Sequence, residues 1–329
     1  MLKYTAKRLI MMIPTLIGIT MISFLVIHLA PGDPTDLVTD LNPQASQSAK
    51  KKLNELYGLD KPLPVQYWNW LKNMAVLDFG RSMATDRRPV REKILERLPV
   101  TLGLNVLSMG IIILISLPLG LLAAVKAGGW FDRTSTVIVF IFFAAPSFWV
   151  ALLGMWLFGV KLGWLPTSGL KSLNYNDLDF FHRLIDLSKH LFMPVLISSL
   201  GGLAGLSRYL RSNMLEIIRQ DFLTTARAKG LSEPIVICKH ALRNALIPVV
   251  TILGLSVPGL VGGSVIMESI YAIPGLGQLF YVAVMGRDYP LVMGGLVIGA
   301  VLTLFGNLLA DLSYALIDPR VRDEAFKVG

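Results

Sequence analysis

Few residues in this chain of 329 have the type and spacing that bond chemistry requires. Ser264 follows two glycines, but a serine becomes a nucleophile only beside a base, usually a histidine or a lysine. A pair of histidines at helical spacing with a glutamate between them, the metalloprotease motif, is absent from the sequence. The only cysteine, Cys238, allows neither an internal disulfide nor a Cys/His zinc site. The residue pattern therefore argues against an intramembrane enzyme.

Nucleotide chemistry is also missing from the sequence. No Gly-x-x-x-x-Gly-Lys-Ser/Thr loop occurs, and this is the loop that cradles phosphates in ATP-driven machines. If the chain takes part in driven transport, its energy must come from a partner or from an ion gradient. A carrier driven by an ion gradient is expected to show internal repeats and ionisable residues at mid-membrane, and neither stands out here.

Composition places the chain in a membrane. Hydrophobic residues make up 53% and charged residues 16%, against about 25% charged residues in soluble domains. Uninterrupted apolar runs reach the roughly 20 residues that span hydrocarbon. We therefore predict an all-α membrane protein with six transmembrane helices, the first uncleaved. The predicted spans are Leu9–Ala30, Val100–Val125, Thr134–Val160, Leu191–Leu210, Leu246–Ile270 and Leu291–Tyr314.

Basic residues set the predicted orientation. The net charge is +9, and with the N-terminus inside, the inner segments hold 15 of the 31 Lys and Arg residues while the short outer loops hold five. The positive-inside rule then places both termini in the cytoplasm. The excess of Lys and Arg is explained by this membrane topology, so we expect no nucleic-acid partner. The predicted regions are residues 1–30, an outer segment 31–99, a core 100–314 with an inner loop 208–245, and a tail 315–329.

The outer segment carries three aromatic residues, Tyr67, Trp68 and Trp70, of the kind that lie at headgroup level. We favour a short helical cap on the membrane, and the alternative is a direct role in receiving a partner or substrate.

The inner loop predicts a helix, a break and a second helix. Residues 208–229 are rich in helix formers, Gly230 suits the left-handed position after a helix, and Pro234 suits a first turn. Such a bent, basic pair is either a docking surface or a solvated helix held near anionic lipid by its Arg and Lys residues.

Glycines and one carboxylate are the candidates for a transport path. Glycines of the fourth and fifth spans permit either close helix packing or local unwinding beside a gated path. The same two interpretations apply to the kink expected near Ser147. Glu268 lies 22 residues after Leu246, roughly 33 Å along an ideal helix. We favour an anchor for the turn that follows Glu268, with a place on the substrate path as the alternative. The glycines are Gly201, Gly202, Gly205, Gly254, Gly259, Gly262 and Gly263.

The inner loop also carries a family resemblance. Thr224-Thr225-Ala226-Arg227-Ala228-Lys229-Gly230, followed by Lys239 to Ala245 and Pro248, resembles the inner-loop signature of binding-protein-dependent ABC importer permeases. In that family the helix before the glycine couples to a cytoplasmic ATPase. The chain departs from the pattern at Thr224, where the family has Glu, and at Thr225, where it has Ala. The resemblance implies the coupling residues Asp221, Thr224, Thr225, Ala226, Arg227 and Gly230. The candidate residues for the translocation path or gate are Ser147, Gly262, Ser264 and Glu268.

Motifs along nearly the whole chain resemble the B-type permease of the dipeptide and oligopeptide group. They include Pro31 to Pro34, Asp78 to Ser82, Pro274 to Gly277 and Arg287 to Pro290. The resemblance implies a bacterial or archaeal cytoplasmic membrane, a second homologous permease, two ATPase subunits that use ATP and Mg, and an extracytoplasmic solute-binding protein. No cofactor or metal is expected in this subunit. The cargo implied is a di- or oligopeptide; importers of nickel complexes, glutathione and other small solutes belong to the same group.

Overall fold

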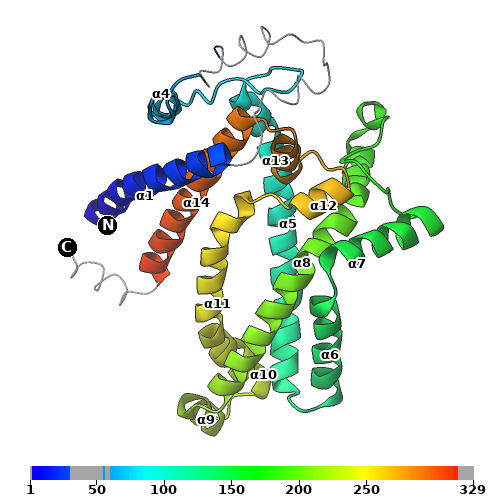
Figure 1. Cartoon of the computed structure of the whole chain (residues 1–329). Coiled ribbons are helices and arrows are strands. Elements are labelled where there is room, and N and C mark those ends of the chain that lie inside the picture. The colour runs from blue at the N-terminus through cyan, green and yellow to red at the C-terminus, as the bar shows by residue number, and fades with distance from the viewer. Residues whose placement is uncertain (1, 30–54, 56–59, 318–329) are drawn as a thin grey trace. The chain divides into compact units, whose positions relative to one another are not determined.

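The computed structural model describes residues 2–29, 55 and 60–317, and these are helical almost throughout (Figure 1). Side chains are described from residue 5 to residue 309 within those ranges. Most of the predicted outer segment before residue 60 and residues 318–329 of the predicted tail lie outside the described part. Within it, the only extended pairing is one isolated bridge, between Arg81 and Pro89.

The described residues contain five helices long and apolar enough to span a membrane, or six if one bent pair counts as a single span. The multi-span, all-α prediction is therefore confirmed. The bent pair joins α6 (Trp130–Ala144) to α7 (Ser147–Gly154) and π-helix η1 (Met155–Lys161) at an angle of 96°. Proline forces the residue before it out of the helical region, and Ala145 has an extended ψ of 131°. Pro146 thus divides the span predicted for 134–160 into two helices.

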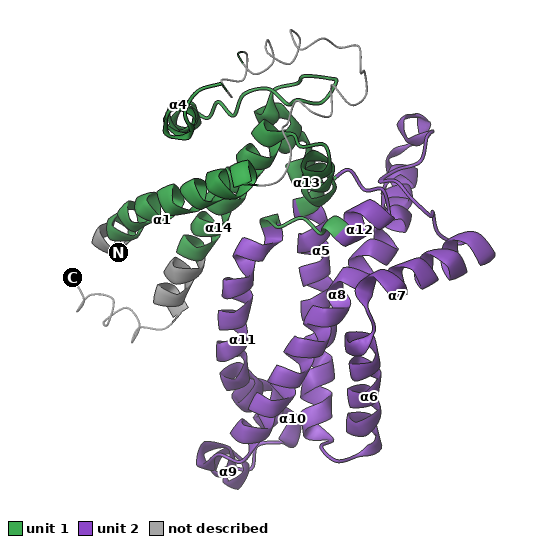
Figure 2. Cartoon of the chain, viewed as in Figure 1, with its two compact units in different colours: residues 1–101, 261–265, 275–329 green, residues 102–260, 266–274 purple. Residues whose placement is uncertain are grey.

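One compact unit, green in Figure 2, comprises residues 1–101, 261–265 and 275–329. It contains α1 (Leu2–Leu29), α4 (Leu63–Ala75), the first turns of α5 (Val90–Val125), α13 (Leu276–Met285) and α14 (Tyr289–Ile317). Helices α1 and α14 pack side by side. A buried core joins the loop before α5 to the last two helices; it comprises Phe79, Val90, Ile94, Leu276, Ala283, Leu291 and Val297.

The other unit, purple in Figure 2, comprises residues 102–260 and 266–274. Its longest helix is α8 (Phe180–Ile218), which packs against α6, α7 and α11 (Leu242–Ser256). Short elements complete it: η2 (Tyr175–Asp177), α9 (Asp221–Ala228), α10 (Glu233–Ile235), η3 (Val236–Ala241), η4 (Val257–Val261, ending at the unit boundary) and most of α12 (Val265–Ile270). Helix α9 lies at the opposite end of this unit from α12 (Figure 1).

Glycine lets α5 and α8 approach closely. A Cβ on Gly120 would lie 2.6 Å from the carbonyl oxygen of Ser207, and one on Gly202 would lie 2.4 Å from Cδ1 of Ile112. Membrane helices depend on such small residues because lipid tails provide no hydrophobic drive for association. For Gly202 the packing interpretation of the span glycines therefore holds.

Candidate functional site

A cavity of about 470 Å³ lies in the purple unit between α5, α8 and the end of α11. The volume falls within the range of about 300–1,000 Å³ that is common for small-molecule sites. Its polar lining consists of hydroxyl and amide side chains, and none of its lining residues carries a charge at neutral pH. The polar lining residues are Asn105, Ser108, Ser198, Tyr209 and Ser256. Three glycines also line the cavity: Gly202, Gly205 and Gly259.

Local unwinding shapes one wall of this cavity. After Ser256, α11 changes to the 3-10 helix η4, whose sequence contains Pro258 and Gly259. Proline removes a backbone donor, so the change of helix type follows from the sequence. Asn105 of α5 donates from Nδ2 to the carbonyl oxygen of Leu260 at 2.7 Å. This bond satisfies a carbonyl in the segment where the α-helix ends, as a membrane interior requires.

The four residues predicted for a path or gate do not line this cavity. Ser147 begins α7 and is exposed, whereas Gly262 and Ser264 lie between η4 and α12. Glu268 lies in α12 and is only 1% exposed, and its carbonyl oxygen accepts a hydrogen bond from the amide of Ile273 at 2.8 Å. A gating role for these residues stays a prediction.

Helix α9 forms a second candidate surface. The prediction of one helix over 208–229 was wrong in one respect, because the chain turns at Arg219–Gln220 before α9 begins. The amides of Arg219 and Gln220 close the end of α8 with short-range bonds to Glu216 and Ile217, and Gln220 is extended with ψ 148°. Asp221 then occupies the first turn, where a carboxylate complements the helix dipole.

The break predicted at Gly230 is present and has the geometry of a Schellman motif. Gly230 has φ +77°, its amide donates to the carbonyl of Arg227, and the amide of Leu231 donates to that of Ala226. The left-handed φ explains why glycine occupies this position.

One face of α9 is held by the protein and the other is free to meet a partner. Leu223 and Ala226 are buried in the largest core cluster, together with residues of α8, η3 and α11. Phe222, by contrast, is 40% exposed, and Thr224 and Thr225 are exposed on the same short helix. The sequence analysis did not identify Phe222 as a candidate contact residue. The sequence signal that could have indicated it is an apolar residue next to polar residues in the predicted inner-loop helix.

Arg227, one of the residues predicted to couple to an ATPase, has a partner within the chain. Its Nε donates to Oε1 of Glu233 at 2.7 Å, which ties α9 to the start of α10. The pair bridges the Gly230 break and so helps to set the angle at which α9 leaves the core.

An ion pair that sequence reasoning missed fixes the same end of the unit. Arg211 of α8 contacts both carboxylate oxygens of Asp132 at the start of α6, with Nε–Oδ1 2.6 Å and Nη2–Oδ2 2.7 Å. The amide of Gly128 also donates to Asp132, at 2.8 Å. Asp132 and Arg211 lie 79 positions apart in the sequence, so no local sequence pattern predicts this ion pair.

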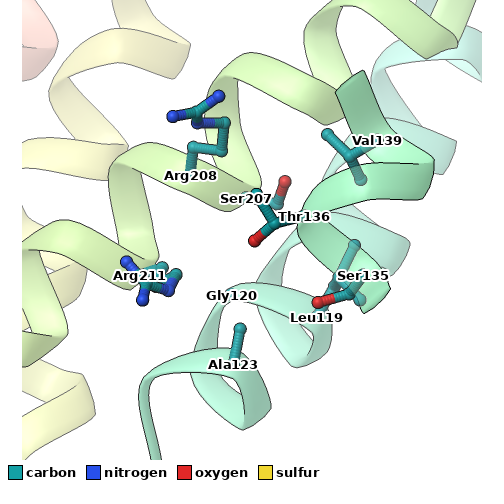
Figure 3. A pocket seen from close by; sticks show the side chains of 9 residues that line it. All are labelled: Leu119, Gly120, Ala123, Ser135, Thr136, Val139, Ser207, Arg208 and Arg211. Carbon is teal, nitrogen blue, oxygen red and sulfur yellow. The ribbon is translucent and has the colours of Figure 1, made fainter. Parts of the chain in front are cut away.

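A cavity of about 20 Å³ lies beside this ion pair, between α5, α6 and α8 (Figure 3). Its walls carry Gly120 and Ala123 of α5 and Ser135 and Thr136 of α6, facing Ser207 of α8. The volume is about that of a single water molecule. It marks a close three-helix junction and is far too small for a solute path.

Comparison with known families matches most of the chain to one type of protein. Residues 116–323 match the family described as binding-protein-dependent transport system inner membrane component, and residues 1–105 match its N-terminal companion. A solved chain of the inward-facing MetNI methionine ABC transporter has a TM-score of 0.50 and 20% identity, covering 68% of this chain and 96% of that one. This likeness concerns the fold.

Relatives with higher identity extend over almost the full length. The oligopeptide transport system permease protein AppB of Bacillus subtilis is 45% identical, with 98% of this chain and 99% of the relative covered. The dipeptide transport system permease protein DppB of Alkalihalophilus pseudofirmus is 38% identical, with 98% and 100% covered. The glutathione transport system permease protein GsiC of Salmonella choleraesuis is 37% identical, with 98% and 99% covered. The chain therefore belongs to the binding-protein-dependent transport system inner membrane components, the multi-pass permease subunits of ABC importers.

Proposed function

We propose that this permease subunit imports di- and oligopeptides and that the cavity of about 470 Å³ is its share of the path. The observation that carries the proposal is the uncharged lining of the cavity, which is largely apolar and carries five hydroxyl or amide side chains. Every peptide residue except proline presents one backbone donor and one acceptor, whatever its side chain. Hydroxyl and amide side chains can hydrogen-bond to both the donors and the acceptors of a peptide backbone. A fixed charge in the cavity would instead favour peptides with one class of side chain.

Family membership supports a proposal for the rest of the transporter. A homologous permease completes the path, a solute-binding protein delivers the peptide from outside, and both termini of this chain lie in the cytoplasm. Two ATPase subunits, which hold the ATP and Mg, dock on α9 and on its counterpart in the second permease. The exposed Phe222, Thr224 and Thr225 of α9 make the contact, while Leu223 and Ala226 transmit the motion to the core.

The test fills the cavity from a position that has space for a larger side chain. A Cβ on Gly205 would meet no heavy atom within 4 Å, and Gly205 lines the cavity. Gly205→Phe should therefore project a ring into the path without forcing the backbone to move. We expect uptake of labelled di- and tetrapeptides to fall at least about tenfold, the loss that one disrupted passage step of about 1.4 kcal/mol produces.

Gly201 provides the matched control. It lies on α8 one turn earlier, has equally open surroundings, and does not line the cavity. Gly201→Phe should retain most of the uptake, and both variants should still co-purify with the other subunits in mild detergent. Normal uptake by Gly205→Phe, or an equal loss in both variants, would refute the cavity as the path.

Glutathione is the second candidate cargo, because a relative of 37% identity is a glutathione permease. Unlabelled glutathione added to the same uptake assay separates the two. Complete suppression by glutathione, together with weak suppression by ordinary dipeptides, would favour glutathione.

A further inference from the structure

A second cavity, of about 440 Å³, lies in the green unit at the ends of two membrane helices. His28, which lines it, is next to the last residue of α1, and Tyr289, which also lines it, is the first residue of α14. Because α1 and α14 are both long and apolar enough to span the membrane, the cavity lies where they reach the membrane surface. The cavity therefore lies at the depth of the lipid headgroups in the bilayer.

The wall of this cavity is amphipathic. Phe24, Phe79 and Met293 supply its apolar part. Asn69 and Asn73, one helical turn apart on α4, supply neutral hydrogen-bonding groups. A ligand that fits must combine a polar head with an apolar body.

Charge on the wall favours an anion. Arg81 and Arg87 line the cavity, and neither has a carboxylate partner among the described residues; Arg81 Nη1 donates only to the carbonyl oxygen of Arg87, at 3.3 Å. The one carboxylate in the lining, Asp78, already accepts from the amide of Gly80 at 2.9 Å. Two other basic residues nearby are paired, Arg88 with Glu96 at 2.9 Å and Lys93 with Asp86 at 2.7 Å. Both guanidinium groups that line the cavity are thus without a carboxylate partner among the described residues.

The loop that carries these arginines is held firmly. The amide of Ser82 donates to Arg88 at 3.0 Å, and the amide of Val90 donates to Gly80 at 3.0 Å. Lys93 Nζ donates to the hydroxyl of Ser82 at 2.8 Å, and that hydroxyl in turn donates to the carboxylate of Asp288. Arg87 itself has φ +45°, a backbone conformation that arginine rarely adopts. The surrounding bonds therefore hold the backbone of the loop from which both arginine side chains extend.

We infer that this cavity binds the headgroup of an anionic phospholipid. Arg81 and Arg87 contact its phosphate, because the planar guanidinium group matches phosphate oxygens in pairs. Phe24 and Met293 lie against the first carbons of the acyl chains. Next to the cavity, Trp68 of α4 is 56% exposed with Lys72 5.3 Å from its ring centre, an arrangement typical of the membrane surface. This inference concerns the chain's own lipid and does not depend on which peptide is transported.

The test measures lipid retention on the full-length chain. The purified, delipidated protein is titrated with dioleoyl phosphatidylglycerol or dioleoyl phosphatidylcholine, and bound lipid is counted by native mass spectrometry. We expect tighter binding of phosphatidylglycerol. Arg81→Gln with Arg87→Gln should weaken that binding at least about tenfold, because the variant removes both charged donors that contact the phosphate.

The control variant removes the same charge from outside the cavity. Lys72→Gln with Arg91→Gln changes two basic residues that do not line it, and it should retain phosphatidylglycerol like the unmodified chain. Arg81→Lys with Arg87→Lys, which keeps the charge but loses the planar fork, should give an intermediate affinity and serves if the glutamine variant does not fold. Equal binding of the two lipids, equal losses in the cavity and control variants, or displacement of the lipid by an N-acetylated dipeptide would overturn the inference.

Discussion

Replacing Arg211 with methionine should loosen the end of the purple unit from which α9 projects. The substitution leaves Asp132 as a buried carboxylate without its ion pair. The two partners are unequal, since the side chain of Asp132 is 5% exposed and that of Arg211 is 33% exposed. An unpaired Arg211 can turn toward water, whereas an unpaired Asp132 cannot.

The expected magnitude follows from this asymmetry. Breaking a buried pair costs about 3–5 kcal/mol, and the lower value of about 3 kcal/mol applies because Asp132 keeps the hydrogen bond from Gly128. Asp132→Asn retains an acceptor for Gly128 and leaves only an arginine that is one third exposed, so it should cost about 1 kcal/mol. The corresponding losses in Tm are roughly 6–12 °C for Arg211→Met and 2–4 °C for Asp132→Asn, at 2–4 °C for each kcal/mol.

The assay is thermal unfolding of the purified chain in one detergent, followed by gel filtration. The double variant, which combines Arg211→Met with Asp132→Asn, should be more stable than Arg211→Met alone. Replacing the carboxylate removes the unpaired buried charge. Arg133→Met, at an exposed position beside Asp132, is the control and should shift Tm by no more than about 2 °C. If Arg211→Met and Asp132→Asn lower Tm equally, or if their effects simply add, the reasoning is refuted.

Four further predictions address coupling, gating, the outer loop and orientation. Gly230→Val should abolish transport and ATPase stimulation while the chain still inserts, because valine strains the left-handed position at φ +77°; normal uptake would contradict this. Glu268→Gln should lower uptake of free and N-acetylated peptides by a similar factor, whereas a loss confined to free-amine peptides would place Glu268 on the path. Lys93 holds the pKa of Asp86 below its ordinary value, so this bond stabilises the fold above about pH 4 and is lost as the pH falls further; the difference in Tm between the chain and Asp86→Asn should shrink from pH 6 to pH 3, and a constant difference would exclude the linkage. An impermeant thiol reagent should miss Cys238 in intact cells and label it in inverted vesicles, and the reverse pattern would invert the proposed topology.

Features encoded locally were predictable from the sequence. Apolar length predicts the membrane helices, the Pro146 context predicts a bend, and a glycine after helix formers predicts the left-handed cap at Gly230. Each depends on a few neighbouring residues whose conformational preferences agree with the final fold.

Features that depend on tertiary packing were not predictable. The turn at Arg219–Gln220 interrupts residues with good helix propensity, because burying Leu223 and Ala226 in the core outweighs propensities of a few tenths of a kcal/mol per residue. The ion pair between Asp132 and Arg211 likewise joins distant positions. The neutral cavity arises from three helices, and no single segment shows it.

The most direct test of the central claim is peptide uptake by the co-purified transporter in proteoliposomes. Labelled dipeptide and the solute-binding protein are placed on one side, and ATP with Mg is supplied to the ATPase side. The account predicts uptake that requires ATP and persists when ion gradients are collapsed. This uptake should fall at least about tenfold in Gly205→Phe and be mostly retained in Gly201→Phe. Uptake that follows an ion gradient without ATP, by this chain alone, would contradict it.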